Sequence, residues 1–126
     1  MERKYAEYAT EQAVELLAID SPTGYTKKAA EWVLNAFSSL GFATKMTGKG
    51  GVLVELGGSD GADGLLLEAH TDTLGAMIAE IKGNGRLKMT PLGGLSPHNV
   101  ETEDVRVVTR DGKIYTGTIQ DRKSVV

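Results

Sequence analysis

The segment Leu65-Leu66-Leu67-Glu68-Ala69-His70-Thr71-Asp72 holds the residues whose types and spacing most clearly allow chemistry. Its apolar run predicts a strand buried on both faces, and His70 follows at the carboxyl end, where open α/β sheets bind ligands. Imidazole is a suitable ligand for zinc or cobalt. Residues i and i+2 of a strand share a side, so Asp72 can hold the other ring nitrogen of His70. The spacing therefore predicts a metal ligand, His70, oriented by a carboxylate, Asp72.

A plainer interpretation of this pair stays open from the residues alone. A single His-x-Asp motif often arises by chance, and a histidine at a strand end is often only hydrogen-bonded to its neighbours. A catalytic zinc also needs about three protein ligands, and the rest of the sequence offers few. His98 lies in a Pro-rich loop, Glu68 is expected to pair with a lysine, and the acidic cluster at 101–104 is expected to be a solvated face.

Two helices are predicted before this segment. Apolar residues at steps of three and four between Ala6 and Leu17 indicate a first helix with one buried face, and Pro22 follows its end. A second helix is expected to begin near Thr26, a possible N-cap, and to end before Gly41, where a left-handed cap is favoured. Its apolar stripe comprises Ala30, Val33, Phe37 and Leu40.

The period of the pattern then changes to two, which predicts strands. Three pairs of strands are expected, each around a Gly-containing turn, at 42–46 with 52–56, 77–82 with 86–90, and 105–109 with 114–119. The segment Ser124-Val125-Val126 is interpreted as a strand cut part-way, so we expect the chain to be the N-terminal portion of something longer. A boundary between a mixed α/β part and a β-rich part is placed near residue 78.

Composition narrows the class of protein. The 126 residues carry a net charge of −3 and no cysteine, so the sequence predicts neither a nucleic-acid partner nor disulfides or thiolate metal sites. No apolar run approaches the length of a membrane span, and a cytoplasmic location is expected. Sugar hydrolysis ranks lowest among the functions considered, because aromatic residues make up only 6% and no opposed carboxylate pair stands out.

The segment Leu66-Leu67-Glu68-Ala69-His70-Thr71-Asp72-Thr73-Leu74-Gly75 resembles the first metal-ligand strand of the glutamyl and tetrahedral aminopeptidases. These are co-catalytic metallo-aminopeptidases that form large hollow assemblies. Three further segments resemble the family in the same order and at family-like spacing, so that the resemblance covers nearly all of the chain. They are Ser21-Pro22-Thr23-Gly24, Pro91-Leu92-Gly93-Gly94, and Val107-Val108-Thr109-Arg110-Asp111-Gly112-Lys113 with the following Gly117.

The resemblance implies an α/β fold in two parts. Residues 1–78 would be the N-terminal part of an α/β/α zinc-peptidase-like catalytic domain. Residues 79–126 would be the first part of a β-rich, barrel-like insert that mediates dimer contacts. The parent protein would then be a homo-oligomer that takes peptides as substrates and removes their N-terminal residues.

The resemblance also assigns roles within the site. His70 would bind one of two divalent metal ions, zinc or cobalt, and Asp72 would be the catalytic residue that orients it. No residue here matches the family's bridging Asp, general-base Glu or remaining ligands, so we expect this chain alone to bind metal weakly at one site and to be inactive. The alternative from another class is a structural or assembly module that pairs through exposed strand edges.

Overall fold

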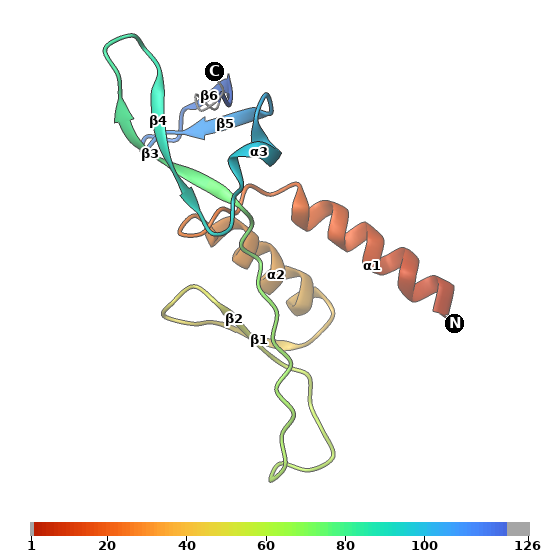
Figure 1. Cartoon of the computed structure of the whole chain (residues 1–126). Coiled ribbons are helices and arrows are strands. Elements are labelled where there is room, and N and C mark those ends of the chain that lie inside the picture. The colour runs from red at the N-terminus through yellow and green to blue at the C-terminus, as the bar shows by residue number, and fades with distance from the viewer. Residues whose placement is uncertain (1, 121–126) are drawn as a thin grey trace. The chain divides into compact units, whose positions relative to one another are not determined.

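The computed structural model describes residues 2–120, which belong to two compact units, Met1–Gly75 and Ala76–Val126. The fold is mixed α/β, as the sequence predicts: helices dominate the start of the first unit, and small two-stranded sheets follow (Figure 1). None of the described helices combines the length and the apolar character that crossing a bilayer requires. The predicted strand at residues 124–126 lies outside the described residues.

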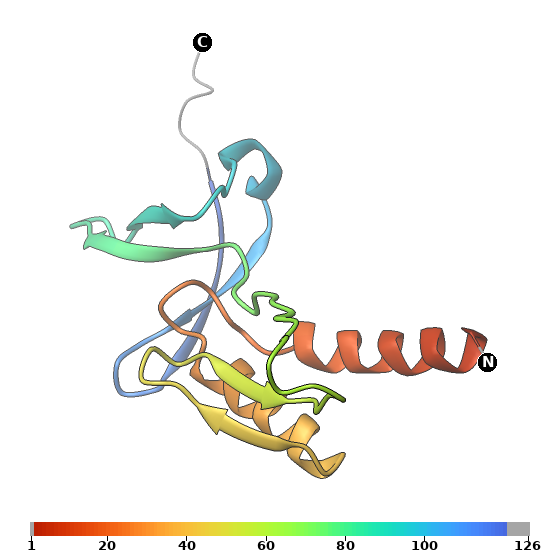
Figure 2. The same cartoon turned by 90° about the horizontal axis from the view of Figure 1, so that it is seen from below.

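Helix α1 (Glu2–Leu17) forms where the apolar spacing predicts a helix. The expectation of a buried face is wrong: of the predicted stripe, Ala6, Ala9 and Ala13 are exposed, Leu17 is 71% exposed and Leu16 is half-buried. Figures 1 and 2 both show α1 extending away from the rest of the first unit, so its apolar side chains have little to pack against. The helical spacing of apolar residues predicts which residues share a face of the helix. It does not predict which other part of the protein packs against that face.

Helix α2 (Lys27–Ser39) ends in the predicted left-handed cap. Gly41 has a φ of +90°, and its N–H donates to the carbonyl of Ser38 at 2.9 Å. The next N–H, of Phe42, donates to the carbonyl of Phe37 at 3.2 Å, and the two rings contact edge to face with centroids 6.1 Å apart. These bonds and the apolar contact together form a Schellman motif. Thr26 is the N-cap residue, although its side chain makes no capping bond.

Strands β1 (Ala43–Met46) and β2 (Val52–Glu55) form the first predicted hairpin, which packs against α2. The register pairs Thr44 with Val54 and Met46 with Val52, and these four residues are the half-buried ones. One face of the hairpin is therefore turned inward, as period-two alternation requires. In the first unit the buried apolar residues are Ala29 and Ala30 of α2, which are 0% and 3% exposed.

The predicted central strand at Leu65–Leu67 does not form, and this expectation is corrected. Residues 56–72 contain no strand, and the three leucines are 86%, 74% and 71% exposed. A strand buried on both faces needs neighbours on each side, whereas the described hairpin of β1 and β2 pairs only with itself. The apolar run thus identifies a segment suited to burial, and the described residues supply no sheet to bury it.

The second unit contains the other two predicted hairpins. Strands β3 (Gly75–Ile81) and β4 (Leu87–Leu92) form one two-stranded sheet, and β5 (Asp104–Val108) pairs antiparallel with β6 (Ile114–Thr118) in another. The predicted irregular loop between them contains one helical turn, α3 (Pro97–Val100). Within the described part of this unit the two sheets are separate, so the expected barrel-like arrangement is not seen there.

A short set of contacts between residues 21–23 and 72–75, which we term the clamp, holds the predicted site segment against the loop after α1. The Thr73 N–H donates to the Ser21 carbonyl at 2.8 Å, and Pro22 and Thr73 form a parallel bridge. Gly75 packs so closely on Pro22 that a Cβ there would lie 2.5 Å from the Pro22 Cβ. Ser21 is 1% exposed, so the centre of the clamp is buried.

Replacing Gly75 with alanine is expected to open the clamp. The added methyl group overlaps the Pro22 ring, and overpacking of this kind costs about 1–3 kcal/mol. We expect hydrogen exchange of the Thr73 amide to accelerate about tenfold or more, measured by NMR. Gly64→Ala is the matched control, because a Cβ at Gly64 meets nothing within 4 Å. Equal exchange rates in the two variants would contradict the close approach at Gly75.

Candidate metal-ligand site

The His70 ring is exposed and is held at one nitrogen. Its Nδ1 lies 3.0 Å from the Asp72 carbonyl oxygen and 3.1 Å from the Asp72 carboxylate oxygen Oδ1. Two acceptors at one nitrogen favour a proton there, so Nδ1 donates and Nε2 keeps its lone pair. No other described residue contacts the ring through a hydrogen bond or ion pair, and the side chain is 83% exposed. The ring therefore presents Nε2 to solvent.

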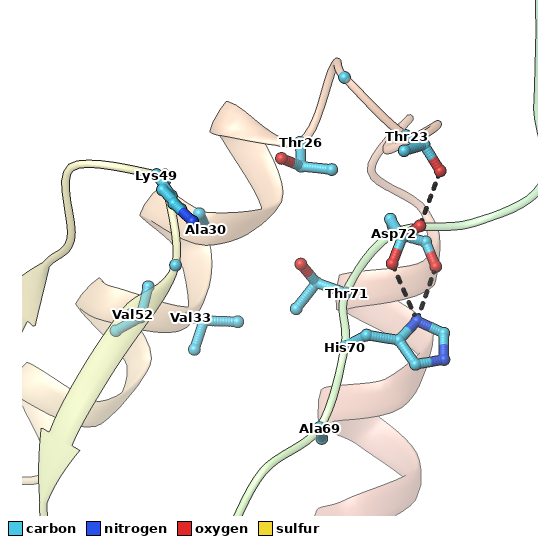
Figure 3. Close-up of a pocket in the computed structure, with 13 residues that line it drawn as sticks. Thr23, Thr26, Ala30, Val33, Lys49, Val52, Ala69, His70, Thr71 and Asp72 are labelled. Atoms are coloured by element: carbon cyan, nitrogen blue, oxygen red, sulfur yellow. Dashed lines mark hydrogen bonds and ion pairs between the residues drawn. The ribbon is translucent and has the colours of Figure 1, made fainter. Parts of the chain in front are cut away.

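The second carboxylate oxygen of Asp72 has a different partner. The Thr23 hydroxyl donates to Asp72 Oδ2 at 2.7 Å, across 49 residues of sequence (Figure 3). The carboxylate thus divides its two oxygens between Thr23 and His70. Figure 3 shows the His70 ring and Asp72 together on one side of the segment, while Thr71 points to the other side. This is the side-sharing that the i, i+2 spacing predicts, although the segment is extended coil and no strand.

These contacts favour the charged form of Asp72. The Thr23 hydroxyl is the main cause that lowers the pKa of Asp72 below its ordinary value of 3.8, and the neighbouring His70 acts in the same direction. Partial burial of the carboxylate, which is 40% exposed, acts the other way. Asp72 therefore remains ionised, and its carboxylate can accept a hydrogen bond from the Nδ1–H of His70.

An open cavity of about 420 Å³ adjoins this segment. Three parts of the first unit line it: the loop from Thr23 to Thr26 with α2 residues Ala30 and Val33, the hairpin turn from Lys49 to Val52, and residues 69–72. Apolar side chains from α2 and β2 face the hydroxyl groups of Thr26 and Thr71 across it (Figure 3). Residues 69–72 form one wall of this cavity, and Figure 3 shows Thr71 pointing toward α2 and β2 while the His70 ring lies on the other side of the segment.

At this site the described residues place one imidazole, that of His70, and no complete set of metal ligands. Within residues 2–120, no group of three or more His, Asp or Glu side chains is arranged so that it could hold a metal ion. His98 is exposed on α3, and neither Glu68 nor the acidic residues at 101–104 line the cavity beside His70. The Nε2 atom of His70 can serve as one metal ligand. A metal site with several ligands requires donors in addition to His70.

Thr23 is the site residue that sequence reasoning missed. The segment Ser21-Pro22-Thr23-Gly24 marks the end of a helix and resembles the family, but neither pattern assigns a role to the Thr23 hydroxyl. The partnership with Asp72 depends on the clamp, which joins two segments that are distant in sequence. A local pattern does not contain that information.

A pH titration is expected to show that the contacts of Asp72 lower the pKa of its carboxyl group. Because the folded contacts favour the carboxylate, the stability that they give is present above the ordinary carboxyl pKa of 3.8. That stability is lost as the pH falls through the lowered pKa, where Asp72 takes up a proton. Carbon-13 NMR of the Asp72 carboxyl group should therefore show a midpoint below 3.8 in the native chain and a higher one in Thr23→Val. A midpoint unchanged by that substitution would contradict the bond.

Comparison with known proteins supplies the context of these residues. A family profile described as M42 glutamyl aminopeptidase matches residues 50–125, the range that contains His70 and Asp72. YhfE of Bacillus subtilis, which is named as a candidate aminopeptidase, is 41% identical over 105 residues, covering 83% of this chain and 30% of YhfE.

Two further relatives carry names that state a specificity. The glutamyl aminopeptidase of Lactococcus lactis is 28% identical over 99 residues, covering 78% of this chain and 28% of that protein. The lysyl aminopeptidase of Pyrococcus furiosus is 28% identical over 100 residues, covering 77% of this chain and 28% of that protein. The chain thus spans about 30% of the length of the relatives that it matches.

Proposed function

Because the chain belongs to the M42 glutamyl aminopeptidase family, we propose that it supplies one metal ligand, His70, and its orienting carboxylate, Asp72, to a dinuclear-metal aminopeptidase. The reaction of the whole enzyme is the hydrolysis of N-terminal residues from peptides. The chain spans about 30% of its relatives' length, and the described residues contain a single candidate ligand, so the remaining donors belong to other parts of that enzyme.

One observation carries the proposal: Nδ1 of His70 is engaged by Asp72, while Nε2 has no partner among residues 2–120 and the side chain is 83% exposed. A histidine that binds a metal through one nitrogen characteristically donates the other N–H to a carboxylate or carbonyl. That second bond fixes the tautomer and the ring orientation and makes the ligating nitrogen more basic. His70 has both kinds of acceptor at Nδ1, so its ring is prepared to bind a cation at Nε2.

In the proposed enzyme, two zinc or cobalt ions, when bound, would lower the pKa of a shared water and polarise the scissile carbonyl. His70 would hold one of these ions through Nε2. Asp72 keeps the proton of His70 on Nδ1 and prevents the ring from turning. The cavity between α2, the β1–β2 turn and residues 69–72 offers room for part of a bound peptide on the side of the segment to which Thr71 points.

The two domains that the sequence predicts have separate roles in this proposal. Residues 1–78 belong to an α/β/α peptidase domain, in which the exposed Leu65–Leu67 run would pair as a central strand with neighbours from other parts of the enzyme. Residues 79–126 belong to a β-rich insert that contributes to a homo-oligomer.

Zinc binding to the purified chain tests the ligand assignment. Isothermal titration calorimetry should find one weak site per chain that is lost in His70→Ala. Asp72→Asn should weaken binding about 10- to 100-fold, because the ring loses its orienting carboxylate. His98→Ala is the control and should bind zinc as the native chain does. Undiminished binding in His70→Ala would contradict the assignment.

Association through the β-rich unit is the second candidate function, and the exposure of β3 favours it. Met77 and Ile81, on the same side of that strand, are 60% and 77% exposed, and the two-stranded sheet leaves both outer edges unpaired among the described residues. Exposed apolar edges promote pairing with another chain, and lysine blocks it.

Light scattering is expected to show self-association that Ile81→Lys reduces. Asn35→Lys, which adds the same charge on an exposed position of α2, is the matched control and should leave association unchanged. A native chain that is monomeric at working concentration would contradict association through β3.

A further inference from the structure

We propose that Thr23 is a positioning residue whose hydroxyl fixes the Asp72 carboxylate in the orientation that engages Nδ1 of His70. The inference deepens the proposed function and rests on it in one respect, namely that His70 is the metal ligand. Thr23 itself would touch neither metal nor substrate. Its effect would reach the ligand through two successive contacts, from hydroxyl to carboxylate and from carboxylate to ring.

The division of the Asp72 oxygens is the first ground for this role. The last side-chain torsion of aspartate has a broad preference, so hydrogen bonds to both oxygens define the carboxylate orientation more closely than a bond to one. Here Oδ2 accepts from Thr23 at 2.7 Å and Oδ1 lies 3.1 Å from His70 Nδ1, so the carboxylate plane is fixed from both ends. Without the hydroxyl, a group that is 40% exposed would reorient toward water.

The placement of Thr23 by the backbone is the second ground. Its neighbours Ser21 and Pro22 are joined to Thr73, through the 2.8 Å backbone bond and the parallel bridge. Gly75 also packs closely on Pro22, which adds a contact at the same junction. Threonine is stiff about its first side-chain bond, so its hydroxyl direction follows the backbone. The donor therefore has a fixed position, although Thr23 is itself exposed.

No other hydroxyl replaces Thr23 in this arrangement. Thr26 and Thr71 line the same cavity, yet neither makes a hydrogen bond to Asp72 among the described residues. The Thr23 bond is also the largest of the effects that favour the charged carboxylate. Thr23 is thus the single side-chain donor that holds the far oxygen of Asp72 in the described structure.

The consequence for the ring is a choice between tautomers. A histidine without a constraint favours the proton on Nε2, and that form has no lone pair there for a metal. A fixed carboxylate at Nδ1 selects the opposite tautomer, in which Nε2 is ready to bind. The Asp72 carbonyl also accepts from Nδ1 and does not depend on Thr23. Loss of the hydroxyl should therefore shift the tautomer population part-way, and loss of the whole carboxylate should shift it further.

Long-range proton–nitrogen NMR of the metal-free chain, at a pH where the ring is neutral, tests the proposal. The native chain and Thr23→Ser, which keeps the hydroxyl, should both show His70 mainly with the proton on Nδ1. Thr23→Val, which keeps the shape and loses the donor, should show a population between those of the native chain and Asp72→Ala. His98, exposed and far along the sequence, serves as the internal reference in every spectrum.

Two outcomes would overturn the proposal. One is a Thr23→Val spectrum identical to that of the native chain. The other is loss of the Thr73 amide bond to Ser21 in Thr23→Val, which would assign the threonine a role in the clamp and not in orienting Asp72. Because no metal is present, the tautomer result is independent of whether His70 binds zinc. Failure of the zinc titration would instead remove the proposed function and leave the tautomer measurement intact.

Discussion

Replacing His70 with alanine in a complete enzyme is expected to reduce peptide hydrolysis by more than about 100-fold. Loss of a residue that only supports a metal ligand costs 10- to 100-fold, and loss of the ligand itself should cost more. A suitable enzyme is a chimera in which this chain replaces the matched part of YhfE, since the two are 41% identical over 105 residues. Hydrolysis of aminoacyl anilides, with zinc or cobalt supplied, is the measurement.

Matched variants of the chimera distinguish loss of the metal ligand from loss of activity caused by a damaged fold. His98→Ala removes the other histidine of this chain and should leave hydrolysis unchanged. Asp72→Asn should reduce hydrolysis about 10- to 100-fold, an effect between the other two. If His70→Ala retained the rate of the parent chimera, the proposed role of His70 would be wrong.

The second large effect is the absence of turnover by the isolated chain. A dinuclear hydrolytic site needs several donors, and residues 2–120 contain no group of three His, Asp or Glu side chains that could hold a metal ion. A lone imidazole also binds zinc too weakly to keep it at low concentration. We therefore expect no anilide hydrolysis above the uncatalysed rate, with or without added metal.

The comparison for that assay is the chimera, measured with the same substrates and metals. Activity in the chimera together with none in the isolated chain would agree with a site completed by other segments. Hydrolysis by the isolated chain that a chelator abolishes, and that persists after a second purification, would contradict the account.

Local elements of the fold were predictable because short-range contacts define them. Phe37, Gly41 and Phe42 form a capping motif that lies within six residues, and each hairpin closes around its own Gly-containing turn. In these cases the residues that decide the geometry are neighbours in sequence. The pairing of each strand follows directly from the turn that joins it to the next.

Non-local features escaped prediction for the converse reason. The run Leu65–Leu67 has the composition of a buried strand, but a strand exists only where others pair with it. The apolar residues of α1 likewise predict an apolar face of the helix without predicting what packs against it. The spacing of His70 and Asp72 predicted their contact correctly, because both residues lie on one short segment. Thr23 entered the site from 49 residues away, through a clamp that no local pattern contains.

The most direct test of the central claim identifies the nitrogen of His70 that binds a metal. Nitrogen-15 NMR of the chain during zinc addition should shift the Nε2 resonance of His70 while Nδ1 keeps its proton. The exposed His98 should respond only at higher zinc concentration, because no described carboxylate or carbonyl orients its ring. Zinc that bound at Nδ1 of His70, or that affected both histidines equally, would contradict the account.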